Sequence, residues 1–291
     1  MKYSDTKDRI AKIAARYFNY MAKRFPVMCL NDEFSSFPRA EKAIEFLDSL
    51  DSFDKDKIRQ DINYIKGLKA SLEKLIAGGL SLEDRIDIAL LGGSMSSFLR
   101  EFERTKIWQV DPNIYIKIFL FGIDQLINRF SFLRRDIDGL VAARISQVPR
   151  LLEEAKRNLK KVPCAYLDVA LEMVDASRHY FETDGFFLNR GGASRKRFRS
   201  SIEKALESLD DFRVYLMKKS SNLSFIKERA LIEDVLRESF YYKKSLDEIF
   251  DIASRSHRDT LKALKIIAKE IDKDMTWQEI LSDYAFKAKN V

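Results

Sequence analysis

Side chains that could carry out chemistry are few in this sequence, and they lie far apart. His179 and His257 are its two histidines. A zinc peptidase helix places two imidazoles one turn apart with a glutamate base beside them, and no His-Glu-x-x-His segment occurs here. His179 has Glu182 three residues further on, a spacing that favours a simple hydrogen bond over a metal pair. We therefore predict no metal ligand and no bound cofactor in this chain.

His257 belongs to a segment with helical spacing of apolar residues, from Ile249 to Ile267. It lies on the flank of that stripe, so we expect its side chain to point toward an interior or a cleft. A hydrogen-bonded core histidine is favoured there over a ligand or an acid–base group. A metal-independent enzyme that uses His257 is a further hypothesis, and it rests on this one residue. The turns that hold a serine nucleophile or a phosphate, G-x-S-x-G and G-x-x-x-x-G-K, are absent.

One basic segment stands out from the interleaved charges of the chain. Ser194 could cap a helix in it, and the free amides of a helix start attract anions, so a phosphate or an acidic partner could dock here. The interpretation that we favour is a loop that runs into a basic first helical turn. Apart from Phe198 no aromatic side chain is available to stack on bases, so nucleic acid is not an expected partner. The cations of the segment are Arg190, Arg195, Lys196, Arg197 and Arg199.

The elements that must position these residues are helices. Apolar residues recur with helical spacing almost everywhere, and the alternation of a strand is almost absent. The 291 residues include 5 Pro and 10 Gly, and neither type occurs after Gly192. We predict an all-α fold, an irregular assembly of about ten or more helices without a significant sheet. Its expected parts are an amino-terminal helical domain (1–183), a linker loop (184–194) and a second helical region (195–291) packed on the first.

Composition indicates a globular chain, with 46% hydrophobic and 33% charged residues and a net charge of +7. The opening MKYSDTKDRI lacks the apolar run of a signal peptide. The apolar stretch 114–127 is interrupted by two charges and is too short to span a bilayer. Cys29 and Cys164 lack the spacing of a metal or redox pair and indicate reduced thiols. These features predict a cytoplasmic protein without a membrane partner.

Three short motifs follow one another in the middle of the chain. The first is Trp108-Gln-Val-Asp-Pro-Asn-Ile-Tyr115, in which an aspartate and a proline suit the start of a helix. The second is Arg144-Ile-Ser-Gln-Val-Pro-Arg-Leu-Leu-Glu-Glu-Ala155, and the third is Asn158-Leu-Lys-Lys-Val-Pro163. We expect packing roles for their large side chains. The motif residues are Trp108, Asp111, Pro112, Tyr115, Arg144, Pro149, Leu152, Ala155 and Pro163.

In this order the motifs resemble the amino-terminal half of the domain of unknown function 885 family, which is large and mostly prokaryotic. The resemblance implies a mostly helical, zinc-peptidase-like protein of roughly twice this length. The family's metal motif, a His-Glu followed by a further His on one helix, belongs to its carboxy-terminal half. No residue of this chain matches that motif, so the resemblance assigns no metal ligand here and implies zinc only in a longer protein.

Two functions from different classes remain open. The leading hypothesis is a non-catalytic helical portion of a zinc-metallopeptidase-like protein, which forms walls of a substrate channel. Its expected partners are a carboxy-terminal half that carries the metal and a peptide-like substrate, and this chain alone is not expected to be an enzyme. The chain would then be a piece of a longer protein, a short relative or half of a split protein, and its ragged end favours truncation. The alternative is a stand-alone helical module that binds an acidic protein or nucleic acid through Arg190–Arg199.

Overall fold

The computed structural model describes residues 3–76, 79–130, 136–183, 187, 192–219 and 229–283, and the side chains of 3–5, 192–197 and 283 are outside that description. Every regular element within these ranges is a helix, and none of the described residues forms a strand. The predicted all-α multi-helix fold is therefore confirmed. The chain divides into two compact units, Met1–Ile226 and Lys227–Val291.

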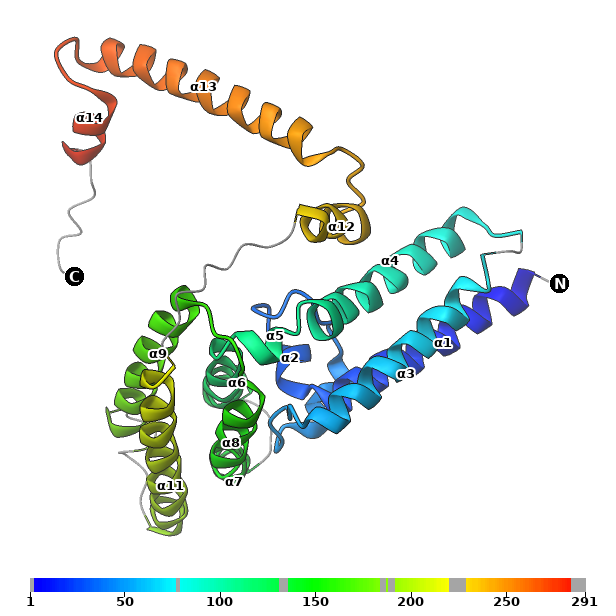
Figure 1. The fold of residues 1–291 in the computed structure, drawn as a ribbon, viewed down its shortest axis with the longest axis vertical. Helices are drawn as coiled ribbons and strands as arrows, with labels where there is room; N and C mark the ends of the chain where they lie inside the picture. The colour runs from blue at the N-terminus through cyan, green and yellow to red at the C-terminus, as the bar shows by residue number, and fades with distance from the viewer. Residues whose placement is uncertain are drawn as a thin grey trace. The chain divides into compact units, whose positions relative to one another are not determined.

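Three long helices form one part of the first unit (Figure 1). They pack on one another through apolar stripes that recur every three or four residues, such as Ile58, Ile65, Leu68 and Leu72 of the second helix. The third begins at a capping box, in which Ser81 and Asp84 satisfy each other's backbone amides. These helices are α1 (Tyr3–Arg24), α3 (Lys55–Glu73) and α4 (Leu82–Leu99).

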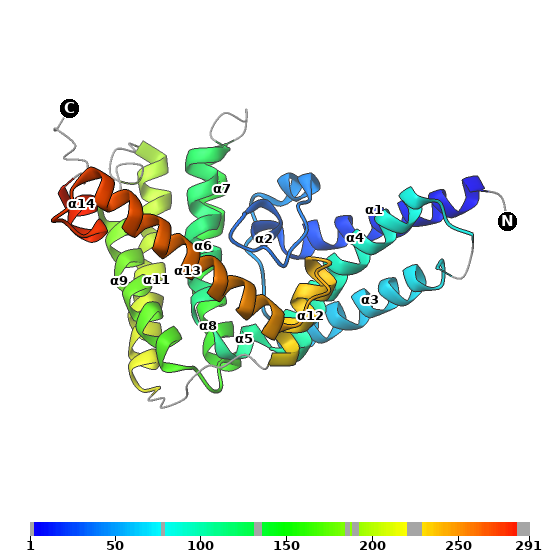
Figure 2. The same ribbon diagram turned by 90° about the horizontal axis from the view of Figure 1, so that it is seen from above.

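A second group of helices crosses the direction of the first (Figures 1 and 2). Its members pack closely on one another, α11 against α7, α8 and α9, and α6 against α7, α8 and α9. They are α6 (Asn113–Asp124), α7 (Ile137–Ile145), α8 (Val148–Asn158), α9 (Cys164–Thr183) and α11 (Gly192–Met217).

Short elements join the two groups. A π-helical turn extends α4 and another extends α6, and a cluster of phenylalanine rings lies in the buried core. Phe25, Phe37, Phe98 and Phe102 contact one another with ring centroids 4.5 to 5.8 Å apart. The short elements are α2 (Pro26–Leu30), η1 (Glu41–Phe46), η2 (Arg100–Arg104), α5 (Ile107–Val110) and η3 (Gln125–Arg129).

The second unit consists of α12 (Arg229–Ser239), α13 (Leu246–Ile271) and α14 (Trp277–Asp283). A capping box starts α13, where the Ser245 hydroxyl accepts the Glu248 amide hydrogen and the Glu248 carboxylate accepts the Ser245 amide hydrogen. Such a box depends on four consecutive residues, so it is encoded locally in the sequence.

The boundary between the units differs from the predicted linker at 184–194. Most of that segment lies outside the described residues. The helix after it, α11, buries Ala205, Leu209, Phe212 and Leu216 in the same core as the preceding helices. An apolar stripe of this length joins the larger core because it would otherwise face water. The division in the structure therefore comes later, between Ile226 and Lys227.

Candidate functional site

The first motif forms the turn from α5 into α6. Lys106 precedes it with a φ of 50°, a left-handed conformation that reverses the chain after η2. The Trp108 side chain is buried, and its Nε1–H donates to the Phe102 carbonyl at 2.9 Å. The hydroxyl of Tyr115, a fully buried residue in the first turn of α6, donates to the Trp108 carbonyl at 2.5 Å. The two aromatic residues thus fix the path of the backbone through the motif.

Asp111 caps the same turn. One of its carboxylate oxygens accepts both the backbone N–H of Asn113 at 2.9 Å and the Asn113 side-chain amide at 2.8 Å. Pro112 lies between them, immediately before the first residue of α6. Asp111 is half-buried, so removal from water raises its pKa, while the two hydrogen bonds from Asn113 act in the opposite direction.

The second motif begins with a fully buried arginine. Arg144 donates from one terminal nitrogen to the Gly122 carbonyl on α6. Its Nε and its other terminal nitrogen are buried without a hydrogen-bond partner among the described residues. The guanidinium lies beside Gly122, and a Cβ added to this glycine would also lie close to Leu50 and Val27. Burial lowers the pKa of Arg144 to about 10, and the nearby carboxylate of Asp51 opposes that shift.

Asp51 is the buried acid of this region. Its two oxygens accept the backbone N–H groups of Val27 at 2.9 Å and Met28 at 3.1 Å, which belong to the first turn of α2. Burial raises the pKa of Asp51 to about 6, and the two amides and Arg144 limit the rise. Asp51 therefore anchors the segment 48–54 to the start of α2.

Polar side chains along α8 hold that same segment from the other side. Gln147 donates to the Asp48 carbonyl at 2.7 Å and accepts the Leu50 amide hydrogen at 3.1 Å. Buried Glu154 accepts the Phe53 amide hydrogen at 2.6 Å. The segment 48–54 does not pair with a strand among the described residues, so its backbone amides and carbonyls need other hydrogen-bond partners. The side chains of Gln147 and Glu154 supply them.

Asn158 completes this row and links it to the first motif. Its side-chain amide donates to the Phe53 carbonyl at 2.7 Å and to the Tyr115 hydroxyl at 3.1 Å. Sequence reasoning assigns no role to Gln147, Glu154 or Asn158. A signal is present in the sequence, because they recur at helical spacing beside the buried apolar residues of α8.

The remaining residues of the second and third motifs lie at helix starts or in the core. Pro149 lies in the first turn of α8, as its position in the motif predicts. Leu152 and Ala155 are buried on the face of α8 that contributes to the core. Pro163 is buried before α9, and its carbonyl accepts the amide hydrogens of Tyr166 and Leu167.

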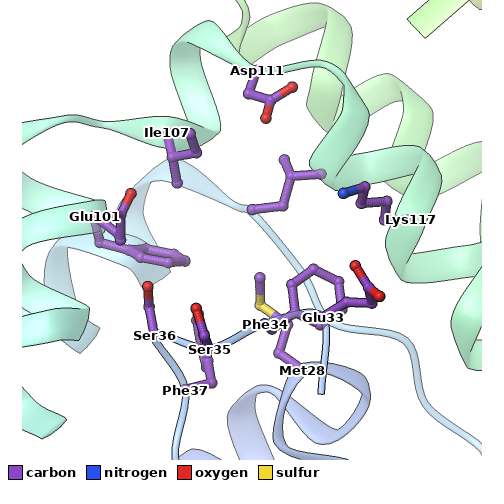
Figure 3. Close-up of a pocket in the computed structure, with 12 residues that line it drawn as sticks. Met28, Glu33, Phe34, Ser35, Ser36, Phe37, Glu101, Ile107, Asp111 and Lys117 are labelled. Atoms are coloured by element: carbon purple, nitrogen blue, oxygen red, sulfur yellow. The ribbon is translucent and has the colours of Figure 1, made fainter. Parts of the chain in front are cut away.

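A pocket of about 160 Å³ opens beside the first motif (Figure 3). Figure 3 shows Asp111 and Lys117 directed into it from the α5–α6 side, with Ser35 and Ser36 on the opposite loop. Its charged groups are Glu33, Glu101, Asp111 and Lys117, three carboxylates against one ammonium. Its apolar wall consists of Met28, Phe34, Phe37, Phe102, Ile107 and Ile114. The arrangement suits a ligand with a positive group on an apolar stem.

The basic segment predicted from the sequence is described only in part. Arg190 is outside the described residues, and Arg195, Lys196 and Arg197 belong to α11 without described side chains. Arg199 is exposed and forms an ion pair with Glu203, one turn along the helix, at 3.0 Å. A pair of this kind is usual on a helix surface, and anion binding by the segment stays a prediction.

The expectation for His257 was wrong. Its side chain is exposed on α13 rather than directed into a core or cleft. The apolar stripe beside it predicted burial, but of the α13 residues only Ala268 is buried. Within the described residues no group of three or more His, Cys, Asp or Glu side chains is placed to hold a metal ion. The same residues include no helix long and apolar enough to cross a membrane.

Comparison with known proteins gives one informative match. No protein-family model matches the chain, and no curated protein matches it. Among solved structures, it is similar to "a putative lipoprotein of unknown function" from Shewanella oneidensis, with a TM-score of 0.67 and 17% sequence identity. The match covers 97% of this chain and 50% of the other, so the chain spans half the length of that protein. At this identity the likeness shows a shared fold.

The same match corrects the predicted location. A neighbour described as a lipoprotein contradicts the assignment to the cytoplasm, which is withdrawn. That assignment rested on the opening residues, on the lack of a long apolar segment and on two cysteines without the spacing of a pair. None of these features determines the compartment, and a lipid anchor requires no spanning helix.

Proposed function

We propose that this chain is a non-catalytic helical portion of a larger zinc-metallopeptidase-like protein and forms walls of its substrate channel. The observation that carries the proposal is the match of nearly the whole chain to one half of a structure twice as long. The order of the motifs from Trp108 to Pro163 supports the same assignment through its resemblance to the domain of unknown function 885 family. Zinc and its ligands belong, in this proposal, to the half that the chain does not match.

The pocket of Figure 3 is the part of the wall that we assign to contact with substrate. Asp111 stands in the first motif and directs its carboxylate into the pocket, and Glu33 and Glu101 add negative charge at the rim. A peptide carries a positive group at its amino terminus and on each lysine or arginine. Those groups, with their apolar stems, fit an acidic pocket with an aromatic wall.

Zinc content and peptidase activity test the proposal. The purified 291-residue chain and a longer protein from the same genome are assayed side by side for bound zinc and for cleavage of fluorogenic peptides. We expect zinc at one equivalent, and turnover, in the longer protein alone. Stoichiometric zinc or turnover in the shorter chain would overturn the assignment to a non-catalytic wall.

We also propose a location at a membrane surface, and the description of the neighbour as a lipoprotein supports this part of the proposal. Fractionation of the native host tests it, with the chain expected in the membrane fraction and released by detergent. Recovery in the soluble fraction alone would remove this part of the proposal.

A further inference from the structure

Helix α13 carries apolar residues on one side of both its halves, and His257 and Thr260 interrupt that side near its middle. It comprises 26 residues, and apolar residues recur every three or four positions from Leu246 to Ala253 and again from Leu261 to Ile271. The opposite side carries charge, including Glu248, Arg255 and Lys262. The residues that define the α13 apolar face are Leu246, Ile249, Phe250, Ala253, Leu261, Leu264, Ile267 and Ile271.

This face is only partly covered, with Leu246, Ile249, Leu261 and Leu264 half-buried. Phe250 is 70% exposed, Ile267 50% and Ile271 56%. The short helix α14 packs on α13, and Ala268 is buried. Among the described residues of the unit the buried apolar side chains are Leu231, Ala268 and Ile280. An exposed apolar surface of this kind marks an interaction site, because its exposure to water is unfavourable by about 25 cal/mol per Å².

The structural match indicates which polypeptide is available to cover the α13 apolar face. Coverage of 97% leaves too few residues unmatched for α13 and α14 to lack counterparts in the Shewanella oneidensis protein. That protein has a further half with no counterpart in this chain. A helix whose apolar side is uncovered in one half requires a complementary helical surface, and the other half is of sufficient length to provide it.

We propose that the α13 apolar face docks a helical polypeptide of about the size of this chain, which takes the place of the neighbour's unmatched half. The inference rests on the proposed function and names the surface through which the two halves join. The docking helix presents apolar side chains to Phe250, Leu264 and Ile267. Arg258 and Lys265 border the second half of the face on one side, and Asp247 and Asp251 border its first half on the same side, so charges of the opposite signs are expected at the matching rim of the partner.

Photo-cross-linking identifies what lies on the face. Benzoylphenylalanine is placed at Phe250 or at Ile267 in the full chain, which is expressed from its own gene in its own host. Both positions are exposed, so the substitutions leave the fold of the unit unchanged. The matched control is the same group at Lys262, on the charged side of α13. Cross-linked peptides are identified by mass spectrometry.

We expect one polypeptide from outside these 291 residues at both apolar positions, in equal amount with the chain, and none at Lys262. Capture of a second copy of this chain, of residues 3–219 of the same chain, or of lipid would overturn the proposal. So would the absence of a cross-link, or a different polypeptide at each position.

Zinc analysis of the cross-linked species separates this inference from the proposed function. If the cross-link is specific but the cross-linked species has neither zinc nor peptidase activity, the docking surface is retained and the peptidase-like assignment is removed. If the longer protein binds zinc and is active, but neither Phe250 nor Ile267 forms a cross-link, the docking surface is removed and the peptidase-like assignment is retained.

Discussion

The Asn158 side-chain amide lies 3.1 Å from the Tyr115 hydroxyl and donates to it. This hydrogen bond joins the turn of the first motif to the row of polar side chains on α8. Tyr115 in turn donates to the Trp108 carbonyl, and Asn158 also donates to the Phe53 carbonyl. Two buried side chains, those of Tyr115 and Asn158, therefore hold together three segments that are far apart in the sequence.

Replacement of Asn158 by Ala should lower the free energy of unfolding by about 1–3 kcal/mol, since it leaves the Phe53 carbonyl buried without its donor. Urea denaturation measures the change. The control is Asn128→Ala, which removes an exposed hydrogen bond to Asp124 and should change stability by less than about 0.5 kcal/mol. Equal effects of the two substitutions would contradict a structural role for Asn158.

Gly122 provides a test of close packing beside Arg144. A Cβ at this position would lie 3.0 Å from Leu50 and from Val27, and 3.3 Å from the Arg144 guanidinium. Gly122→Ala should therefore destabilise the protein by about 1–3 kcal/mol, because the surrounding core must shift. Gly67→Ala is the matched control in α3, where no atom lies within 4 Å, and it should stabilise by about 0.5–1 kcal/mol. Thermal unfolding distinguishes these opposite signs, and stabilisation by both would contradict the packing.

Local chemistry explains which features could be predicted from the sequence. The helices follow from apolar periodicity, and the boxes at Ser81 and Ser245 follow from residues three apart. The hydrogen bonds from the Phe53 amide to Glu154 and from Asn158 to Tyr115 connect residues 101 and 43 positions apart, and no local pattern encodes such pairings. The pocket likewise combines two segments far apart in the sequence, 28–37 and 101–117.

His257 shows a second limit of the sequence. Apolar periodicity on α13 predicts a face that avoids water, and it does not tell whether this chain or another polypeptide covers that face. The helix was predicted correctly, and burial of His257 was not found. Arg144 shows the reverse case, in which a residue type that is mostly exposed in proteins is fully buried because the packing of α6 against α7 encloses it.

The buried carboxyl of Asp51 predicts a dependence of stability on pH. Its pKa is about 6 in the folded protein and 3.8 without the fold, so the folded state binds more protons between these values. This group therefore makes the protein less stable as pH rises from about 4 to about 6, by about 3 kcal/mol in total. Asp51→Asn should remove that slope, as measured by urea unfolding at a series of pH values.

Asp54 is the control for this experiment. Its pKa is lowered, first by the hydrogen bond from the Lys57 amide, so its contribution to stability is lost as pH falls. Asp54→Asn should change the slope in the direction opposite to Asp51→Asn. An unchanged dependence of stability on pH between about 4 and 6 in the Asp51→Asn variant would contradict the burial assigned to Asp51.

The acidic pocket predicts weak binding of amines. Titration of the chain with lysine amide, followed by NMR, should perturb residues that line the pocket, such as Ile107 and Ile114. Glu33→Gln removes one exposed carboxylate of the rim and should weaken binding about two- to fivefold, since an exposed charge pair contributes about 0.2–1 kcal/mol. Glu41→Gln removes a carboxylate outside the pocket and should leave the affinity unchanged. Norleucine amide has the amino terminus without the side-chain ammonium, so comparison of the two ligands identifies which positive group the pocket contacts. Equal affinities of the Glu33 and Glu41 variants would show that the pocket's charge does not select its ligand.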